Sequence, residues 1–236
     1  MIKKSFLTLI VLLLCCTINA QDLISPSYGF SHSKTAYITL EDGTEINGTI
    51  KDIDRDKGLI EYIKLQDGTG KKHKLKPKDI KFMYLPPSGL DNLGKKMSFA
   101  SNFKKWDDQK LNEDFLNQGY AYFETADVKV KKKNSKLLMQ LLNPTFSKEF
   151  KVYCDPYAKQ TTSLGVGGIK FVGGDLKSYY VAKKDSPAFL LKKKDYKKEF
   201  VPLWGSCDKV ISEYKEIIWT DLVKHIITYS ECMDPS

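Results

Sequence analysis

The chain has 236 residues, of which 42% are hydrophobic, and a formal net charge of +9. This length allows one large domain or two small ones. A positive charge of this size first suggests nucleic acid as a partner. The amino terminus indicates export, however, and export disfavours that class of ligand.

Residues 1–20 have the pattern of a secretory signal peptide. Two lysines precede an uncharged, mostly apolar run over 6–18, and the small residue Ala20 stands just before Gln21. The run is shorter than the ~20 residues that a membrane-spanning helix needs. We therefore expect a periplasmic or extracellular protein that is cut between Ala20 and Gln21 and has no membrane span after cleavage.

The mature chain would still be basic, because the loss of two leader lysines lowers the formal charge from +9 to +7. Outside the cytoplasm the available polyanions are lipid headgroups, acidic glycans and acidic proteins. The alternative is that the lysines only keep exposed strands soluble and unaggregated. Charge alone leaves both interpretations open.

Residues 35–85 are expected to form a small β barrel, SH3-like in size. Short apolar or alternating segments follow one another, separated by polar turns such as Asp42-Gly43. Several short strands with tight turns in about fifty residues favour a barrel or a rolled sheet. The expected strands are 37–40, 45–53, 59–65 and two short segments on either side of Pro77.

A linker is predicted at 86–98 and an antiparallel β domain at 99–205. The linker is rich in Pro, Gly and Asn. A weak helical pattern covers 106–118. Beyond it, aromatic and β-branched segments recur at short intervals, which is typical of a sandwich or barrel of about six to eight strands. The last expected strand is "KKEFVPLW", at 197–204.

The tail, 206–233, has helical periodicity. Apolar residues share one face near Val210, and a second apolar stripe runs through 221–231. A short connection between two such segments predicts an antiparallel αα-hairpin. The fold class is therefore mainly β within α+β: a small SH3-like barrel, an antiparallel sandwich or barrel, and a C-terminal helical hairpin.

The hairpin also predicts a disulfide. The start of its first helix lies beside the end of its second, which brings Cys207 close to Cys232. Disulfides persist in an oxidising compartment outside the cytoplasm. We expect a Cys207–Cys232 bridge, and we expect Cys154, the third cysteine of the mature chain, to be buried and reduced.

The stretch "SLGVGGIKFVGGD", at 163–175, resembles a phosphate-binding loop only in its glycine content. A P-loop needs Lys after its second glycine, but Gly174 and Asp175 follow Gly173. A dinucleotide loop needs glycine where Lys170 stands. We predict β-turns around a short strand at 169–172, and no cofactor.

No motif in the chain predicts catalytic, cofactor-binding or metal-binding residues. The segment "DIDRDKG", at 52–58, begins like a calcium loop but has Lys57 where glycine is required, so a charged turn between strands is expected. The histidines at 32, 73 and 225 lack metal-ligand spacing. A pair between Cys154 and a distant histidine has no support from neighbouring residues.

Lysine-rich segments lie at 129–136, 183–185 and 192–200, and aromatic residues interleave with the last two. Basic and aromatic residues together are typical of a surface for single-stranded nucleic acid or glycan. Alternating strands with lysine outside and aromatics inside would produce the same string. The possible contacts to an anionic ligand are Lys183, Lys184, Lys192, Lys193, Lys194, Tyr196, Lys197 and Lys198.

Several segments resemble those of uncharacterised exported envelope proteins of Bacteroidetes. The resemblance covers the mature chain and is carried by "CCTINAQ", "LEDGTEINGTI", "SYYVAKKD", "KKKDYKKEF" and the tail "LWGSCDKVISEY…DLVKHIITYSEC". It implies location in the envelope and supports the paired tail cysteines. It implies no activity and no site residues.

These patterns favour an exported, non-catalytic envelope protein that binds a protein partner or an anionic envelope component such as a glycan or a lipid headgroup. The alternative is a hydrolase that acts on an envelope polymer, which would need a cleft with converging carboxylates or a Cys154–His pair. A third interpretation is a structural protein whose lysines only make it soluble.

Overall fold

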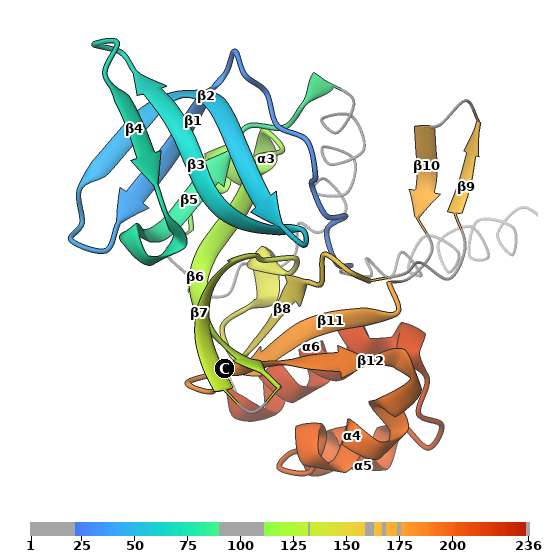
Figure 1. The fold of residues 1–236 in the computed structure, drawn as a ribbon. Coiled ribbons are helices and arrows are strands. Elements are labelled where there is room, and N and C mark those ends of the chain that lie inside the picture. Colours follow the sequence, from blue (N-terminus) through green and yellow to red (C-terminus); the bar gives the residue numbers. More distant parts are fainter. Residues whose placement is uncertain are drawn as a thin grey trace, which may run out of the picture.

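A computed structural model describes residues 22–89, 111–131, 133–158, 163–166, 169–173 and 176–234. The expected leader, 1–20, and most of the expected linker lie outside the described residues. The predicted class is confirmed: the fold is mainly β, with a few helices near the C-terminus (Figure 1).

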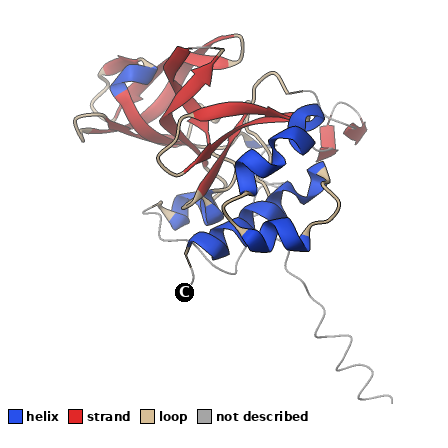
Figure 2. Ribbon diagram, turned by 90° about the horizontal axis from the view of Figure 1, so that it is seen from below, coloured by secondary structure: helices blue, strands red, loops and turns tan. Residues whose placement is uncertain are grey.

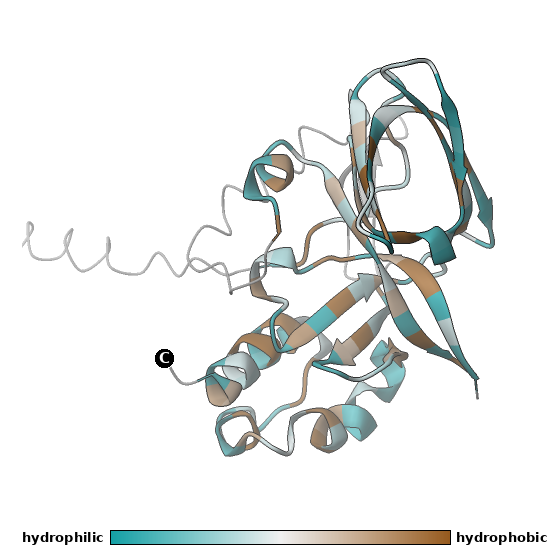
Figure 3. Ribbon diagram, turned by 90° about the vertical axis from the view of Figure 1, so that its left-hand side faces the viewer, coloured by the Kyte–Doolittle hydropathy of each residue, from teal (hydrophilic) through white to brown (hydrophobic). Residues whose placement is uncertain are grey.

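The strands expected in 35–85 are all present. Neighbours in this part of the sheet pair in antiparallel fashion, with the first strand in the sequence between the second and the last. They curl into a ring around an apolar core (Figure 3). The strands are β1 (Thr35–Leu40), β2 (Glu45–Asp56), β3 (Leu59–Asp67), β4 (Lys72–Leu75) and β5 (Ile80–Leu85), and the 3-10 turn η1 (Pro77–Asp79) precedes β5.

The charged turn expected at 52–58 is shorter than predicted. Strand β2 continues to Asp56, and only Lys57 and Gly58 form the turn, with φ angles of 48° and 77°. Two successive residues with positive φ suit the right-handed twist of a hairpin. The acidic residues therefore lie on a strand, where Asp52 forms an ion pair of 3.0 Å with Lys64.

The second half of the chain adds strands to the same sheet. The complete ten-stranded sheet has the order β4-β3-β2-β1-β5-β6-β12-β11-β8, with β7 also paired to β6. The strand expected at 169–172 is confirmed in a separate two-stranded ladder. The new elements are α3 (Glu113–Asn117), β6 (Ala121–Val130), β7 (Lys133–Gln140), η2 (Pro144–Phe146), β8 (Phe150–Cys154), β9 (Ser163–Val166), β10 (Ile169–Gly173), β11 (Ser178–Lys183) and β12 (Ala188–Lys192).

Strand β6 connects the two halves. Near its start, Ala121 pairs with Leu85 of β5, and near its end, Val128 pairs with Ala188 of β12. β7 runs antiparallel to β6. The expected separate antiparallel sandwich therefore does not form, because the ten-residue β6 is long enough to pair with both halves. The β6–β12 pair is parallel, unlike the other described strand pairs.

The segment 197–204, expected as a strand, is instead part of helix α4 (Tyr196–Trp204). Its buried aromatic residues, Tyr196, Phe200 and Trp204, recur every four positions and form one helical face, to which buried Leu203 also belongs. Pro202 lies close to the end of the helix, which continues only to Trp204. The aromatic residues of this segment are therefore spaced with the period of a helix and not with the period of a strand.

The helical hairpin and its disulfide are confirmed. Cys207 and Cys232 form a disulfide across a sequence separation of 25 residues, and Cys154 is free and buried. The C-terminal helices gather on one side of the sheet (Figure 2) and share a core with β8, β11 and β12. The remaining elements are η3 (Lys193–Asp195), α5 (Asp208–Glu213), η4 (Trp219–Asp221) and α6 (Leu222–Met233).

Residues 22–31 cross from one half of the molecule to the other. The Ile24 N–H donates to the Leu142 carbonyl at 2.8 Å, and the Ser31 N–H donates to the Pro86 carbonyl at 3.0 Å. Pro86 is buried although it belongs to the expected linker. Residues 22–31 are thus part of the folded body. In the part of the chain that the structure describes, no helix is long and apolar enough to cross a membrane.

Gly48 lies where β2 passes closest to β3. A Cβ atom at Gly48 would lie 2.4 Å from the Gln66 carbonyl oxygen. We expect Gly48→Ala to lower the free energy of unfolding by about 1–3 kcal/mol, because the backbone of one strand must move. Urea unfolding followed by circular dichroism measures this loss. Gly68→Ala, with open space around the new methyl group, is the control, and an equal effect of both substitutions would contradict the prediction.

The disulfide should stabilise the helical hairpin by restricting the unfolded chain. For a separation of 25 residues, the loop-entropy relation predicts that Cys207→Ala/Cys232→Ala lowers the free energy of unfolding by about 3 kcal/mol. Addition of a reductant to the unmodified protein should give a similar loss, whereas Cys154→Ala should leave this sensitivity to reductant unchanged. An unfolding midpoint that does not respond to reductant would refute this role.

Candidate functional site

The structure separates the residues that sequence analysis grouped as possible anion contacts. Lys184, Lys192, Lys193, Lys194, Lys197 and Lys198 are exposed, and Lys183 is half-buried. Tyr196 was wrongly included, because its ring is only 1% exposed in the helical core. In helix α4 this side chain lies on the buried face. In a strand it could have lain on the same face as the lysines.

A groove of about 930 Å³ is lined by residues from the tip of the β6–β7 hairpin, strand β12 and helix α4. Figure 1 shows where these elements lie. The apolar lining of the groove includes Phe189, Leu190 and Leu203. Four lysines from three different parts of the sheet converge on it, and two of them, Lys183 and Lys192, were predicted contacts. The basic residues are Lys129, Lys131, Lys183 and Lys192; the acidic residues Asp195 and Glu199 also line the groove. We call this the basic groove.

Lys129 and Lys131 were not among the predicted anion contacts, although they belong to the lysine-rich segment 129–136. The predicted contacts lie in segments where aromatic residues stand between the lysines, and 129–136 contains no aromatic residue. The aromatic ring of the groove, Phe189, comes instead from β12. Pairing of β6 with β12 brings the lysines and the ring together.

Ion pairing distinguishes the basic groove from a second lysine-lined hollow. That hollow, of about 560 Å³, shares Lys183 with the groove. Its other lysines are Lys148, Lys151 and Lys184. Each of these lysines already has a carboxylate partner. The pairs are Lys148–Asp234, Lys151–Glu124 at 2.7 Å and Lys184–Glu149 at 3.2 Å.

The groove lysines are less neutralised. Within the described ranges, Lys129, Lys131 and Lys192 form no ion pair. Lys183 is held against the helices: its Nζ donates to the Pro202 carbonyl at 3.5 Å and lies 4.9 Å from the centre of the Tyr229 ring. Four lysines against two carboxylates leave the groove positive. None of the four ammonium groups is paired with a carboxylate among the described residues.

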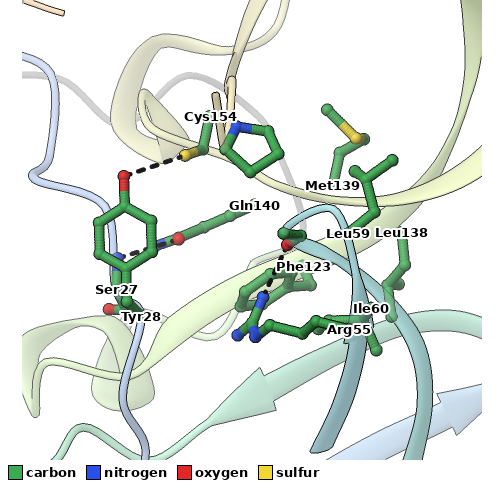
Figure 4. Close-up of a pocket in the computed structure, with 12 residues that line it drawn as sticks. Ser27, Tyr28, Arg55, Leu59, Ile60, Phe123, Leu138, Met139, Gln140 and Cys154 are labelled. Atoms are coloured by element: carbon green, nitrogen blue, oxygen red, sulfur yellow. Dashed lines mark hydrogen bonds between the residues drawn. The ribbon is translucent and has the colours of Figure 1, made fainter. Parts of the chain in front are cut away.

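The cavity beside Cys154 is too small to be a substrate cleft. It measures about 30 Å³ (Figure 4), which is room for a water molecule or two. The Tyr28 hydroxyl lies 4.0 Å from the Cys154 sulfur, and Arg55 donates to the Gly58 carbonyl at 3.1 Å. Burial raises the pKa of the Cys154 thiol to about 11, so the reactive thiolate is scarce at neutral pH.

None of the histidines contacts Cys154. The side chain of His32 bonds to the Ile50 carbonyl, that of His73 to Asp67, and that of His225 to Tyr196. A Cys154–His pair, one of the two arrangements that the hydrolase alternative could use, is therefore not formed. Groups of three or more His, Cys, Asp or Glu residues that could hold a metal ion are absent from the described residues.

His225 belongs to a polar pair enclosed by aromatic rings. Its Nδ1 accepts a hydrogen bond of 2.5 Å from the Tyr196 hydroxyl when the imidazole is neutral, and Trp204 Nε1–H donates to that hydroxyl at 3.3 Å. The Tyr214 ring stands perpendicular to the imidazole, with the ring centres 4.3 Å apart. Burial lowers the pKa of His225 to about 4. This pair is structural, because His225 is fully buried.

Comparison of the chain with models of protein families, with curated proteins and with solved structures finds no match. The function must therefore be argued from the groove itself.

The pKa of His225 predicts a loss of stability in mild acid. Between pH 6.5 and about 4 the unfolded chain binds a proton at this imidazole and the folded chain does not, so stability falls as the pH falls through that window. We expect His225→Gln to remove about 2 kcal/mol of the difference in unfolding free energy between pH 7 and pH 4.5. Urea unfolding of both proteins at the two pH values measures it; an identical pH dependence would exclude this residue as the cause.

Proposed function

We propose that this is an exported, non-catalytic binding protein of the cell envelope that holds an anionic ligand in the basic groove. The observation that carries the proposal is the convergence of Lys129, Lys131, Lys183 and Lys192 on one groove. None of the four has a carboxylate partner among the described residues. An anion in the groove would supply that partner.

The chemistry of the groove fits binding and not bond cleavage. Its two carboxylates, Asp195 and Glu199, come from one short stretch around the start of α4. The described residues that line it include no histidine or cysteine. Outside the groove, Glu124 accepts hydrogen bonds from Lys151 and Tyr153, and buried Asp155 accepts one from Ser178. These carboxylates already have structural partners.

Location in the envelope is supported by the leader pattern of the first twenty residues and by the Cys207–Cys232 disulfide. In the envelope the ligand classes are acidic glycans, lipid headgroups and acidic segments of proteins. Cosedimentation with envelope fractions of the host at low and high salt tests the association, which should weaken at high salt because ions screen exposed charges.

Charge reversal tests the groove directly. We expect Lys129→Glu/Lys192→Glu to weaken binding of fluorescent poly-glutamate by about tenfold or more, because two attractive contacts become repulsive. The control is Lys51→Glu/Lys72→Glu, which makes the same change of net charge at exposed positions of β2 and β4. Fluorescence polarisation measures both affinities, and circular dichroism confirms that both variants fold. Equal losses would show that net charge, and not the groove, attracts the polymer.

A further inference from the structure

One wall of the basic groove is a strand edge that its neighbour leaves uncovered. The ladder between β6 and β12 consists of two pairs, Ala188 with Val128 and Phe189 with Lys129. Strand β6 ends at Val130, whereas β12 continues to Lys192. The last part of β12 therefore runs past the end of β6 on that side.

The direction of the backbone groups follows from the pairing with β11. The Lys193 N–H donates to the Lys177 carbonyl at 2.9 Å, so the next pair along, Lys192 with Ser178, is not hydrogen-bonded. In an antiparallel ladder the two kinds of pair alternate. The C=O of Leu190 and the N–H of Lys192 consequently point away from β11, towards the side that β6 leaves open.

This edge lies in the groove, because Leu190 and Lys192 both line it. An edge strand with free backbone groups is a template for another extended chain. Alternate residues of such a chain would point to opposite faces. In the groove they would meet the lysines and the apolar side chains Phe189 and Leu203.

We infer that the ligand is an extended acidic peptide segment of a partner protein, which pairs with the open edge of β12 at Leu190–Lys192. This inference rests on the proposed function and narrows it to one class of ligand. Backbone hydrogen bonds supply affinity, and alternating acidic and apolar side chains supply selectivity, as in other cases of strand addition. An acidic glycan would use the lysines but would leave the strand edge and the apolar lining unused.

The test uses an end-capped, fluorescent octapeptide in which Glu and Val alternate. Two analogues of equal composition carry backbone N-methyl groups, one on every Val and the other on every Glu. In a strand the N–H groups of the two sets point to opposite edges, so only one analogue loses the hydrogen bonds to β12. We expect that analogue to bind about tenfold more weakly than the other. Fluorescence polarisation with the full mature chain measures the difference, and the parent peptide should slow hydrogen exchange at the Lys192 amide.

The outcomes separate this inference from the proposed function. Equal binding of the two N-methylated analogues, whether tight or weak, overturns strand addition. A second outcome is that polygalacturonate binds, the peptides do not, and Lys129→Glu/Lys192→Glu weakens the binding of polygalacturonate while Lys51→Glu/Lys72→Glu does not. In that case the anion-binding function stands and the peptide inference fails. If neither the peptides, poly-glutamate nor polygalacturonate binds, both fail.

Discussion

The arrangement of this protein depends on β6, which pairs with strands of both halves of the chain. Its first residues extend the curled sheet of β1–β5 through the pair Ala121–Leu85, and its last residues meet β12 through the pairs at Val128 and Lys129. Hydrogen bonds in a ladder impose one register, because a slip by a single residue would turn every side chain to the other face. Loss of β6 would therefore separate the β core from the helical region and would dismantle the groove between them.

Helix α4 forms the other wall of the groove, and its position is set by an aromatic core. Two residues on the buried face of α4, Tyr196 and Trp204, form a hydrogen bond with each other. Tyr196 also forms a hydrogen bond with His225 of α6. The disulfide between Cys207 and Cys232 joins the start of α5 to the end of α6. Burial of the Tyr196 hydroxyl would be costly without these hydrogen bonds, so they favour one position of α4 over others of similar apolar burial.

The number of lysines in a hollow does not by itself show that the hollow can bind an anion. Carboxylates of the protein can already form ion pairs with those lysines. Lys151 and Lys184 lie in a hollow as basic as the groove, but Glu124 and Glu149 neutralise them. Lys129 and Lys192 are exposed and carry no such partner among the described residues. An exposed ion pair contributes little to stability, whereas an unpaired lysine beside an apolar lining is available to a ligand. The difference between the two hollows lies in the arrangement of acidic residues and not in the number of lysines.

The sequence by itself determined what depends on neighbouring residues: the strands of 35–85, the strand at 169–172 and the helical tail, since periodicity and turn residues are local signals. The predicted helical hairpin in turn placed Cys207 beside Cys232. The sequence pattern misassigned 197–204, because lysines and aromatics spaced for a helix also resemble an alternating strand. Only the tertiary structure decided that β6 joins both halves, that Tyr196 faces inward, and that Lys129 and Lys192 share a groove. The physical reason is that these facts depend on contacts between residues far apart in the chain, and the hydrogen bonds and burial that select such contacts have no counterpart in local periodicity.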